Sequence, residues 1–358
     1  MKIFFLLASL GSGGAERVVS LLANRMSDDG HEVQVVCLKY NDVYYQLDEK
    51  VKLVMAMDLT RNRFSELFWL RRYIKKEKPD VVIPFTEGVY CFTIASLLGT
   101  KIPVIASERL DPSAMSLPRK ILKRLLLPYA DWLVVQTQSI KSCFPKSIQK
   151  KTSVIYNPVN DEVFNQESEM GIANSFELKS NRIVSVARLF PQKNQEMMIR
   201  AFAKIADVFP DWQLVIFGEG PLRDSLQLTI DSLQLTNRIL LPGRTEHVIE
   251  ELQKSKIFCL SSDYEGMSNS MIEALCVGLP IISTRVSGST ELVDNGRNGF
   301  LIDINDEKGL VVAFREMIQN ERKRSEMGQY SKTKSSLFAL DLITRQWLDL
   351  ISCICRHK

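Results

Sequence analysis

The sequence has few histidines and no clustered acidic metal ligands. Its 358 residues include three histidines, at positions 31, 247 and 357. We therefore do not expect a Ser-His-Asp triad or a histidine-based metal site. An Asp-x-Asp pair is also missing, so no obvious carboxylate pair is present to hold Mg²⁺ on a diphosphate. If the protein binds a diphosphate, we expect cationic side chains to replace the metal, and we predict no metal and no other cofactor.

The chain also lacks paired cysteines and long apolar runs. Its seven cysteines form no CxxC pair, which is typical of a protein from a reducing cytoplasm. No apolar run approaches the roughly 20 residues of a membrane-spanning helix. The apolar start, Met1–Ser9, is short and is followed by glycines, so it predicts a buried first strand rather than a signal peptide. With 45% hydrophobic and 25% charged residues, the composition is that of a soluble globular protein with room for two domains.

Charge is distributed unevenly along the chain. Residues 1–160 contain 23 Lys and Arg against 15 Asp and Glu, a balance of +8. Residues 161–358 contain 23 against 27, a balance of −4. The basic excess lies between Arg61 and Lys151, so we expect the first half to meet an anionic partner.

Runs of Val, Ile and Leu alternate with helix-like segments along the chain. In the first half the runs are Lys2–Ala8, Val33–Leu38, Val81–Phe85, Val104–Ala106 and Trp132–Gln136. In the second half they are Ile183–Ala187, Gln213–Phe217, Lys256–Leu260, Pro280–Ser283 and Gly299–Ile302. Because these runs lack polar alternation, they predict strands that are covered on both faces.

The pattern therefore predicts an α/β fold with two Rossmann-like, doubly wound parallel-sheet domains that face each other across a cleft. We expect the first domain at 1–160, a linker at 161–180 and the second domain at 181–336. A C-terminal helix at 337–358 is expected to pack back on the first domain.

One segment of the second half points to a ligand. The sequence EGMSNSMIE at 265–273 follows a buried strand and opens a helix, so its loop lies where open parallel sheets bind ligands. The helix start offers free N–H groups to an anion, and Gly266 permits a close backbone approach. Glu265 precedes the helix and Glu273 lies more than one turn inside it, so the two acids cannot contact the same atoms. This spacing suggests one long ligand that contacts both acids. An ordinary helix start with surface acids is the alternative.

Three other strand-to-helix loops have suitable chemistry. Arg188 and Lys193 follow the first strand of the second half, and together they can neutralise a diphosphate leaving group. A solvated loop is the alternative there. Gly13 and Gly14 open a helix after the first strand, and Gly218 lies in the turn GEGPL. Tight packing alone also explains both glycine turns.

These pieces together resemble the retaining glycosyltransferase family 4, which has the GT-B fold. The resemblance spans nearly the whole chain and rests on these motifs in order: GGAER at 13–17, GHEV at 30–33, NPV at 157–159, ARLFPQKN at 187–194, GEGPL at 218–222, PGR at 242–244, the Glu265/Glu273 pair and NGFL at 298–301.

The resemblance implies roles for the matching residues. Arg188 and Lys193 would bind the donor diphosphate, and Glu273 would bind the ribose of the nucleotide. Glu265 would lie beside the donor sugar. The remaining donor-binding positions would be Gly13 and Gly14 on the diphosphate, Gly218, the backbone of Gly266, Met267 and Ser268, and Arg244 and Thr245 near the base.

The chain departs from the family pattern at one place. It has Ser107-Glu108-Arg109 where Ser-Glu-His is common, and an arginine cannot act as a base at neutral pH. Arg109 is still expected to bind phosphate or sugar, while Glu108 or Asp111 receives the acceptor proton. A structural Glu108–Arg109 pair is the alternative.

Two basic stretches, Arg61–Lys78 and Leu117–Tyr129, suit an anionic membrane surface or a lipid diphosphate. Arg71, Arg72 and Lys75, with Arg17, are the expected ligands of lipid phosphate. Ordinary solvated helices are the alternative, and we see no motif for nucleic acid.

The motif subset resembles enzymes that extend undecaprenyl-diphosphate-linked glycans, especially N-acetylgalactosaminyltransferases and enzymes of O-antigen or capsule assembly. We therefore expect a transferase that uses a UDP-sugar at the cytoplasmic face of a membrane, with peripheral attachment. Two rivals remain. A UDP-sugar epimerase on the same scaffold would act without an acceptor, and an inactive scaffold protein would not turn over. The donor sugar, the linkage and the oligomeric state are not determined by these motifs.

Overall fold

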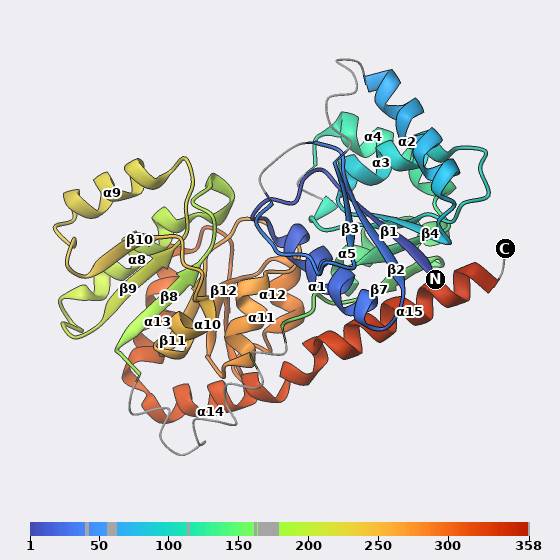
Figure 1. The fold of residues 1–358 in the computed structure, drawn as a ribbon. Coiled ribbons are helices and arrows are strands. Elements are labelled where there is room, and N and C mark those ends of the chain that lie inside the picture. The colour runs from blue at the N-terminus through green and yellow to red at the C-terminus, as the bar shows by residue number, and fades with distance from the viewer. Residues whose placement is uncertain (40–42, 56–62, 113–114, 161–162, 164–178, 357–358) are drawn as a thin grey trace. The chain divides into compact units, whose positions relative to one another are not determined.

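The computed structural model describes residues 1–39, 43–55, 63–112, 115–160, 163 and 179–356 (Figure 1). The chain divides into two compact units, one of residues 1–160 with 338–358 and the other of residues 161–337. Most of the predicted linker, 161–180, and the beginning of the basic stretch at Arg61 lie outside the described residues.

The first unit contains parallel strands in two hydrogen-bonded groups. Their order is β3-β2-β1-β4 in one group and β5-β6-β7 in the other. Single parallel bridges, Val82 to Val104 and Phe85 to Ser107, link the two groups. The strands are β1 (Lys2–Leu7), β2 (Glu32–Cys37), β3 (Lys52–Met55), β4 (Val81–Pro84), β5 (Ile105–Ser107), β6 (Trp132–Val135) and β7 (Thr152–Val154).

Helices cover both faces of this sheet. They are α1 (Gly14–Asp28), α2 (Arg63–Glu77), α3 (Glu87–Leu97), α4 (Leu117–Leu126), α5 (Gln138–Ser142), α6 (Lys146–Gln149) and α15 (Leu340–Arg356), with a short 3-10 turn η2 (Leu127–Tyr129). Successive residues of β1 point to opposite faces, so Phe5 joins a core with α1 and α15 while Phe4 joins a core with α2 and α3. Both faces are apolar because both are buried.

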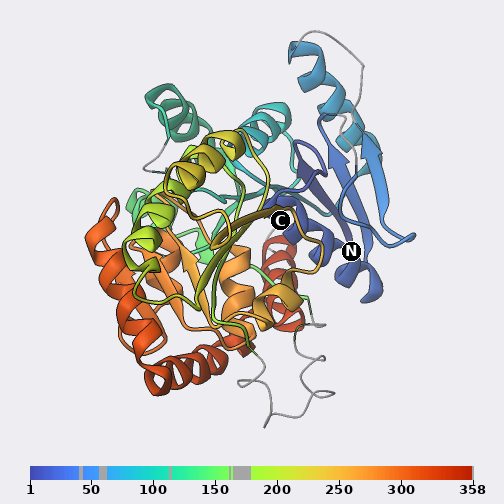
Figure 2. The ribbon, with the colours of Figure 1, turned by 90° about the vertical axis from the view of Figure 1, so that its left-hand side faces the viewer.

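The C-terminal helix belongs to the first unit. Its Trp347 is fully buried and stacks on Phe85 with 6.0 Å between the ring centroids. Val159 N–H donates to the carbonyl of Phe338 over 2.9 Å, which ties the two segments of the unit together. Figure 2 shows α15, in red, beside α1, in blue.

The second unit has one parallel sheet with the order β10-β9-β8-β11-β12-β13. Its strands are β8 (Arg182–Val186), β9 (Gln213–Phe217), β10 (Ile239–Gly243), β11 (Ile257–Leu260), β12 (Ile281–Thr284) and β13 (Gly299–Ile302). Its helices are α8 (Gln195–Ala206), α9 (Arg223–Ser232), α10 (Val248–Gln253), α11 (Asn269–Cys276), α12 (Ser287–Leu292), α13 (Glu307–Gln319) and α14 (Glu321–Thr333), with 3-10 turns η3 (Pro191–Lys193) and η4 (Ser335–Phe338).

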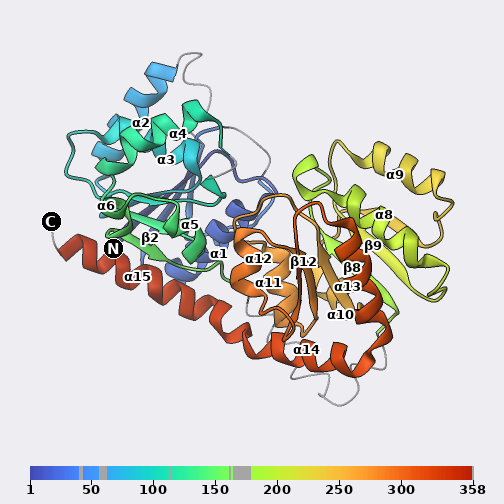
Figure 3. The same ribbon diagram turned by 180° about the vertical axis from the view of Figure 1, so that it is seen from behind.

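This unit is doubly wound. Helices α8, α9 and α13 pack on one apolar face of the sheet, and Figure 3 shows α11 and α12 on the opposite side from α13. The direction in which successive strands are added to the sheet reverses at β8, which lies between β9 and β11. In open α/β sheets, ligands bind at the carboxyl ends of the strands at such a reversal. The loops after β8 and β11 therefore form the expected site.

None of the described helices combines the length and the hydropathy that crossing a membrane requires.

Candidate functional site

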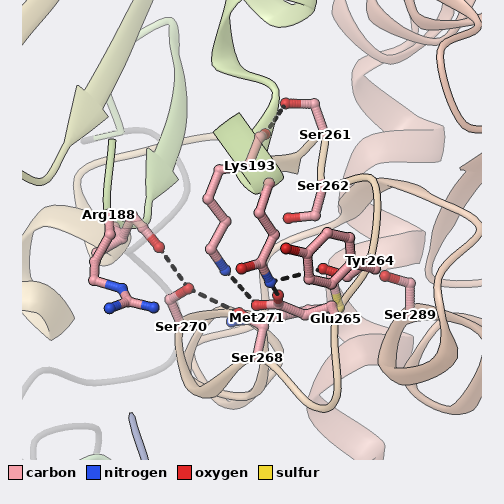
Figure 4. Close-up of polar contacts among 12 residues, drawn as sticks. Arg188, Lys193, Ser261, Ser262, Tyr264, Glu265, Ser268, Ser270, Met271 and Ser289 are labelled. Atoms are coloured by element: carbon pink, nitrogen blue, oxygen red, sulfur yellow. Dashed lines mark hydrogen bonds and ion pairs between the residues drawn. The ribbon is translucent and has the colours of Figure 1, made fainter. Parts of the chain in front are cut away.

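The loops after β8 and β11 are joined by an ion pair between Lys193 and Glu265 (Figure 4). Lys193 ends the 3-10 turn η3, and Glu265 lies four residues before the start of α11. Both side chains are largely buried, with 12% and 11% of their surface exposed. Two residues that are 72 positions apart thus meet because β8 and β11 are neighbouring parallel strands.

Gln192 gives Glu265 a second donor. Its Nε2 donates to Oε2 of Glu265 over 2.8 Å and to the carbonyl of Tyr264 over 2.8 Å. The backbone also closes this contact, because Asp263 N–H donates to the carbonyl of Gln192 over 2.9 Å. The Glu265 carboxylate is therefore held at both oxygens, and its orientation is fixed before any ligand binds.

Asn194 fixes the far end of the β8 loop. It has a left-handed backbone with φ of 46°, which asparagine tolerates better than most residues. Its Nδ2 donates to Asp263 over 2.9 Å and to Asn305 over 2.8 Å. Ser261, just after β11, donates to the carbonyls of Lys193 and Asn194 over 2.9 Å each. The two loops are thus bound together along their length.

The start of α11 is also tied to β8. Ser268 is the N-cap of the helix and accepts from Met271 N–H over 3.4 Å. Ser270 donates to the carbonyl of Val186 over 2.7 Å. Gly266 meets Gly288 at the start of α12, where a Cβ on Gly288 would lie 2.2 Å from the Gly266 carbonyl oxygen.

The sequence places Glu273 more than one turn inside the helix, and in the structure it lies in α11 with only 2% of its surface exposed. Met267 is buried as well, with 6% exposed. The two acids of the motif are therefore buried at two levels of one loop and helix.

Arg188 is exposed and lies over the ring of Phe190, with 4.9 Å between the guanidinium carbon and the ring centroid. It does not join the Lys193–Glu265 network in Figure 4. Gly218 packs behind this loop with φ of +146°, and a Cβ there would lie 1.9 Å from the carbonyl oxygen of Ala187. Close packing therefore accounts for the glycine at position 218.

Arg244 and Thr245 follow β10 at the edge of the sheet, and β9 separates that strand from β8. Arg244 is exposed, and Thr245 accepts from His247 N–H over 3.0 Å.

In the first unit, Gly13 and Gly14 lie at the start of α1, directly after β1 and its short loop. A Cβ on Gly13 would meet the carboxylate of Glu16 at 2.2 Å. Arg17 lies in the first turn of the same helix and is partly buried.

Glu108, which follows β5, is fully buried within a cluster of donors. Tyr90 O–H donates to its Oε2 over 2.8 Å, and Lys123 Nζ donates to the same oxygen over 3.1 Å. The backbone N–H groups of Arg109 and Leu110 donate to Oε1 over 3.2 and 3.4 Å. Both carboxylate oxygens are therefore occupied by donors of this chain.

Arg109 does not make a side-chain ion pair with Glu108. Its Nη1 donates to Oδ1 of Asn157 over 2.7 Å, and its guanidinium lies over the ring of Phe85 at 4.2 Å. Gln136 donates to the same Asn157 oxygen over 2.8 Å. Burial lowers the pKa of Arg109 to about 9, while the nearby charge of Glu108 opposes that change.

Three other cations of the first unit lie on α2 and differ in their surroundings. Arg71 donates to the carbonyls of Ser96 and Leu98 over 2.9 and 2.8 Å, so it caps the end of α3. Arg72 and Lys75 are exposed on α2. Arg72 and Lys75 are therefore accessible to solvent, whereas Nη1 of Arg71 is used in hydrogen bonds within the unit.

Comparison with known proteins then decides the family. The profile described as Glycosyltransferase Family 4 matches residues 12–163, and the one described as Glycosyl transferases group 1 matches residues 168–334. A Campylobacter jejuni protein named GalNAc-alpha-(1->4)-GalNAc-alpha-(1->3)-diNAcBac-PP-undecaprenol alpha-1,4-N-acetyl-D-galactosaminyltransferase is 30% identical over 365 aligned residues, which cover 98% of each chain. The chain belongs to glycosyltransferase family 4.

A second relative of this glycosyltransferase is the Escherichia coli UDP-Gal:alpha-D-GlcNAc-diphosphoundecaprenol alpha-1,3-galactosyltransferase. It is 29% identical over 323 residues, covering 84% of each chain.

Solved structures agree on the fold. Anabaena HepE in complex with UDP and glucose has a TM-score of 0.81 at 19% identity, over 98% of this chain and 99% of its own. Sucrose-phosphate synthase from Thermosynechococcus elongatus has a TM-score of 0.84 at 16% identity, over the whole of both chains. The two units of the glycosyltransferase are thus the two Rossmann-like domains of a GT-B fold.

Several residues of the site were not singled out from the sequence. Gln192 and Asn157 lie inside quoted motifs, but nothing in a motif shows which atom they contact. Tyr90 carries no local signal, whereas Lys123 was expected, with its basic stretch Leu117–Tyr129, at a membrane surface or a lipid diphosphate. The fold instead buries Lys123, and the two side chains reach Glu108 from α3 and α4. Among the described residues, no group of three or more His, Cys, Asp or Glu side chains is placed to hold a metal ion.

Proposed function

We propose that this glycosyltransferase moves a hexose or an N-acetylhexosamine from a UDP-sugar to a polyprenyl-diphosphate-linked oligosaccharide, with retention of configuration. The main supporting observation is the buried Lys193–Glu265 pair at the reversal of the parallel sheet in the second unit. It offers a cation for a phosphate and an oriented carboxylate for a sugar hydroxyl at the same strand ends.

The names of the relatives support both substrates. The C. jejuni and E. coli relatives are named for undecaprenol-linked diphosphate acceptors, and the E. coli name includes UDP-Gal. A third relative, from Erwinia amylovora, is named as an amylovoran biosynthesis glycosyltransferase and is 25% identical over 351 residues. We propose for this chain the assembly of a lipid-linked glycan for a surface polysaccharide or a glycoprotein.

The proposed mechanism needs few protein bases. The bond between the sugar anomeric carbon and the diphosphate oxygen breaks, an acceptor hydroxyl oxygen bonds to that carbon on the same face, and the leaving phosphate oxygen takes the hydroxyl proton. Arg188 and Lys193 offset the charge that grows on the diphosphate, as expected of groups that stabilise a transition state electrostatically. Glu265 orients the sugar, and Glu273 binds the ribose. No metal is assigned a role.

The remaining donor contacts in this proposal follow the family pattern. Arg244 and Thr245 lie near the base, the backbone of 266–268 near the sugar, and Gly13 and Gly14 near the diphosphate. Gly218 holds the Arg188 loop from behind. Arg17, Arg72 and Lys75 attract the phosphates of the acceptor.

We also propose that α4 attaches the protein peripherally to the cytoplasmic face of a membrane. Its apolar side chains are exposed, with 71% of Leu117, 53% of Ile121 and 64% of Leu125 accessible to solvent. Lys120 and Arg124 lie on the same helix, which contains no acidic residue. This combination suits an interfacial helix on anionic lipid. In vesicle flotation, the double variant Ile121→Glu/Leu125→Glu should bind anionic vesicles more weakly than the wild type.

The direct test is a donor screen. Purified protein is incubated with UDP-GalNAc, UDP-GlcNAc, UDP-Gal or UDP-Glc and a synthetic polyprenyl-diphosphate saccharide, with EDTA present. UDP release and a lipid product one sugar heavier are the expected results, and NMR of the product gives the anomeric configuration. Conversion of the donor without an acceptor would indicate an epimerase. Absence of any turnover with all donors would contradict the proposal.

A further inference from the structure

The carboxyl ends of β5 and β6 hold a cluster of buried polar atoms that lack hydrogen-bond partners. Among the described residues, no partner is within reach of Nε or Nη2 of Arg109, of Oγ of Ser107, or of Oε1 of Gln136. Their residues are all less than 9% exposed. Leaving a buried donor of a charged group unsatisfied is costly, by about 1–3 kcal/mol or more for each, so this concentration at one sheet edge calls for an explanation.

The unsatisfied edge of Arg109 is one of the two guanidinium edges that can bind an oxyanion through two hydrogen bonds. In a guanidinium, the Nε and Nη2 hydrogens point the same way and form a two-pronged fork that matches two oxygens of a phosphate or carboxylate. Nη1 is already used by Asn157. Phe85 supports the guanidinium plane at 4.2 Å. One edge is therefore anchored by the protein, and the other is oriented but has no acceptor.

The nearest acid of the chain does not satisfy this fork. Glu108 is the adjacent residue, but its carboxylate accepts from Tyr90 and Lys123 and from two backbone N–H groups. Lys123 adds a second buried cation to the cluster. The Glu108 carboxylate is thus compensated by Lys123 and by donors of its own surroundings, and it leaves the Nε–Nη2 fork of Arg109 unsatisfied.

The adjoining backbone is strained. Thr86 directly follows Phe85 and has φ of 73° with ψ of 151°, a conformation that is essentially limited to glycine. Its N–H donates to the carbonyl of Ser107 over 3.0 Å, so the ends of β4 and β5 are held together there. Strain of this kind persists where the surrounding structure enforces it, and such positions are concentrated at binding sites.

We infer that the Nε–Nη2 fork of Arg109 binds a phosphate group of a substrate diphosphate. The inference rests on the proposed function for the identity of the diphosphate, which belongs either to the acceptor lipid or to the UDP moiety. In either case Arg109 is an anion-binding residue that pairs with two phosphate oxygens, and it does not exchange a proton.

Binding measurements distinguish the two sources. Calorimetry without donor sugar uses three probes: UDP, a short-chain polyprenyl diphosphate linked to the acceptor saccharide, and the same saccharide without the diphosphate. Arg109→Gln should weaken binding of one or both diphosphate probes by about 10- to 100-fold and leave the uncharged saccharide unaffected. Arg109→Lys should restore little, because lysine retains the charge but lacks the fork.

Arg25→Gln is the matched control, since it removes a cation of the same unit whose guanidinium pairs with Asp29 and Asp341. It should leave all three affinities unchanged. Weaker binding of the lipid-linked probe alone identifies the acceptor diphosphate, and weaker binding of UDP alone identifies the donor. Unchanged affinity of a folded Arg109→Gln protein for both diphosphates overturns the inference.

If the Arg109 variants do not fold, the wild type still provides a test. In protein labelled with ¹⁵N-arginine, addition of inorganic pyrophosphate should shift the resonance of a buried, slowly exchanging Nε–H. No shift of any such signal at saturation would overturn the inference. Sugar transfer is measured separately, so a wild type that transfers sugar while Arg109 proves irrelevant leaves the proposed function intact.

Discussion

Each unit places a lysine beside a glutamate that follows a strand of its sheet, but the two pairs differ in burial. In the first unit, Glu108 is fully buried and Lys123 is 7% exposed. In the second unit, Glu265 is 9% exposed and Lys193 is partly exposed. The first pair is sealed among side chains and backbone donors, whereas the second lies in loops at the edge of its core.

The two units differ in the charge that remains uncompensated. In the second unit Lys193 and Glu265 neutralise each other, so a ligand must compete for a pair that is already oriented. In the first unit Lys123 neutralises Glu108, and Arg109 remains with a neutral partner, Asn157. The same kind of pair is thus part of the core in one unit and part of the expected ligand site in the other.

The largest effect is expected from Lys123→Met. It leaves the carboxylate of Glu108 buried without its cation, which should cost about 3–5 kcal/mol of unfolding free energy. Urea denaturation measures the loss. The double variant Lys123→Met/Glu108→Gln should recover part of it, because the uncompensated charge is then gone. A single variant within about 1 kcal/mol of the wild type would show that the pair is not sealed.

The same substitution in the second unit, Lys193→Met, should act on turnover instead. We expect kcat to fall by about 10²- to 10³-fold, which is typical when a group that stabilises transition-state charge is lost. The unfolding free energy should change little, because Gln192 still donates to Glu265. Lys204→Met is the control, since Lys204 is exposed and pairs with Glu307. Equal turnover of the two variants would remove Lys193 from the mechanism.

A third comparison concerns glycines with positive φ in the two units. Gly218→Ala should cost about 2–3 kcal/mol, because the new Cβ would lie 1.9 Å from a backbone oxygen as well as in a strained conformation. Gly30→Ala, with φ of +84° and open space around it, should cost about 1 kcal/mol from the backbone alone. Thermal unfolding measures both losses of stability. Equal losses would show that the loop after β8 moves to accommodate the new Cβ without a cost in free energy.

The smallest effect is a difference in pH dependence. Burial raises the pKa of Glu251, but hydrogen bonds from Lys254 and Arg182 outweigh it, so the pKa is lowered overall. Its contribution is complete above the ordinary glutamate pKa and disappears as the pH falls through the lowered value. Glu251→Gln should therefore lose about 1–2 kcal/mol at pH 7 and nothing in strong acid.

Glu87 of the first unit should behave in the opposite way. Burial raises its pKa despite Arg119, so the native state binds the extra proton and stability falls as the pH rises through that range. The stability of Glu87→Gln relative to the wild type should therefore be higher at pH 7 than in acid. Chemical unfolding at pH 4 and pH 7 tests both signs, and the same sign for both variants would contradict this account.

Much of the fold could be predicted from the sequence. All ten predicted apolar runs are strands, and their ends differ from the observed ones by no more than one residue. The prediction missed β3, β7 and β10, and each of these is the edge strand of its sheet. Edge strands are partly exposed and pair on one side only, so they need no continuous apolar run. In β10, Pro242 and Gly243 further hide the pattern.

The site was predictable only in part. The loops around Arg188, Lys193 and Glu265 were located because strand-to-loop-to-helix patterns are local. Which cation meets the carboxylate was not, because Lys193 and Arg188 have equivalent sequence contexts. Only the fold turns Lys193 to Glu265 and leaves Arg188 exposed over Phe190.

Local sequence patterns were sufficient to predict the parallel α/β architecture and the loops at the strand ends, because hydrophobic periodicity and glycine placement act over a few neighbouring residues. The tertiary structure decided which charges are compensated. Electrostatic partners such as Lys123 and Glu108, or Arg109 and Asn157, are brought together from distant segments by strand order and burial, and no local pattern records that distance.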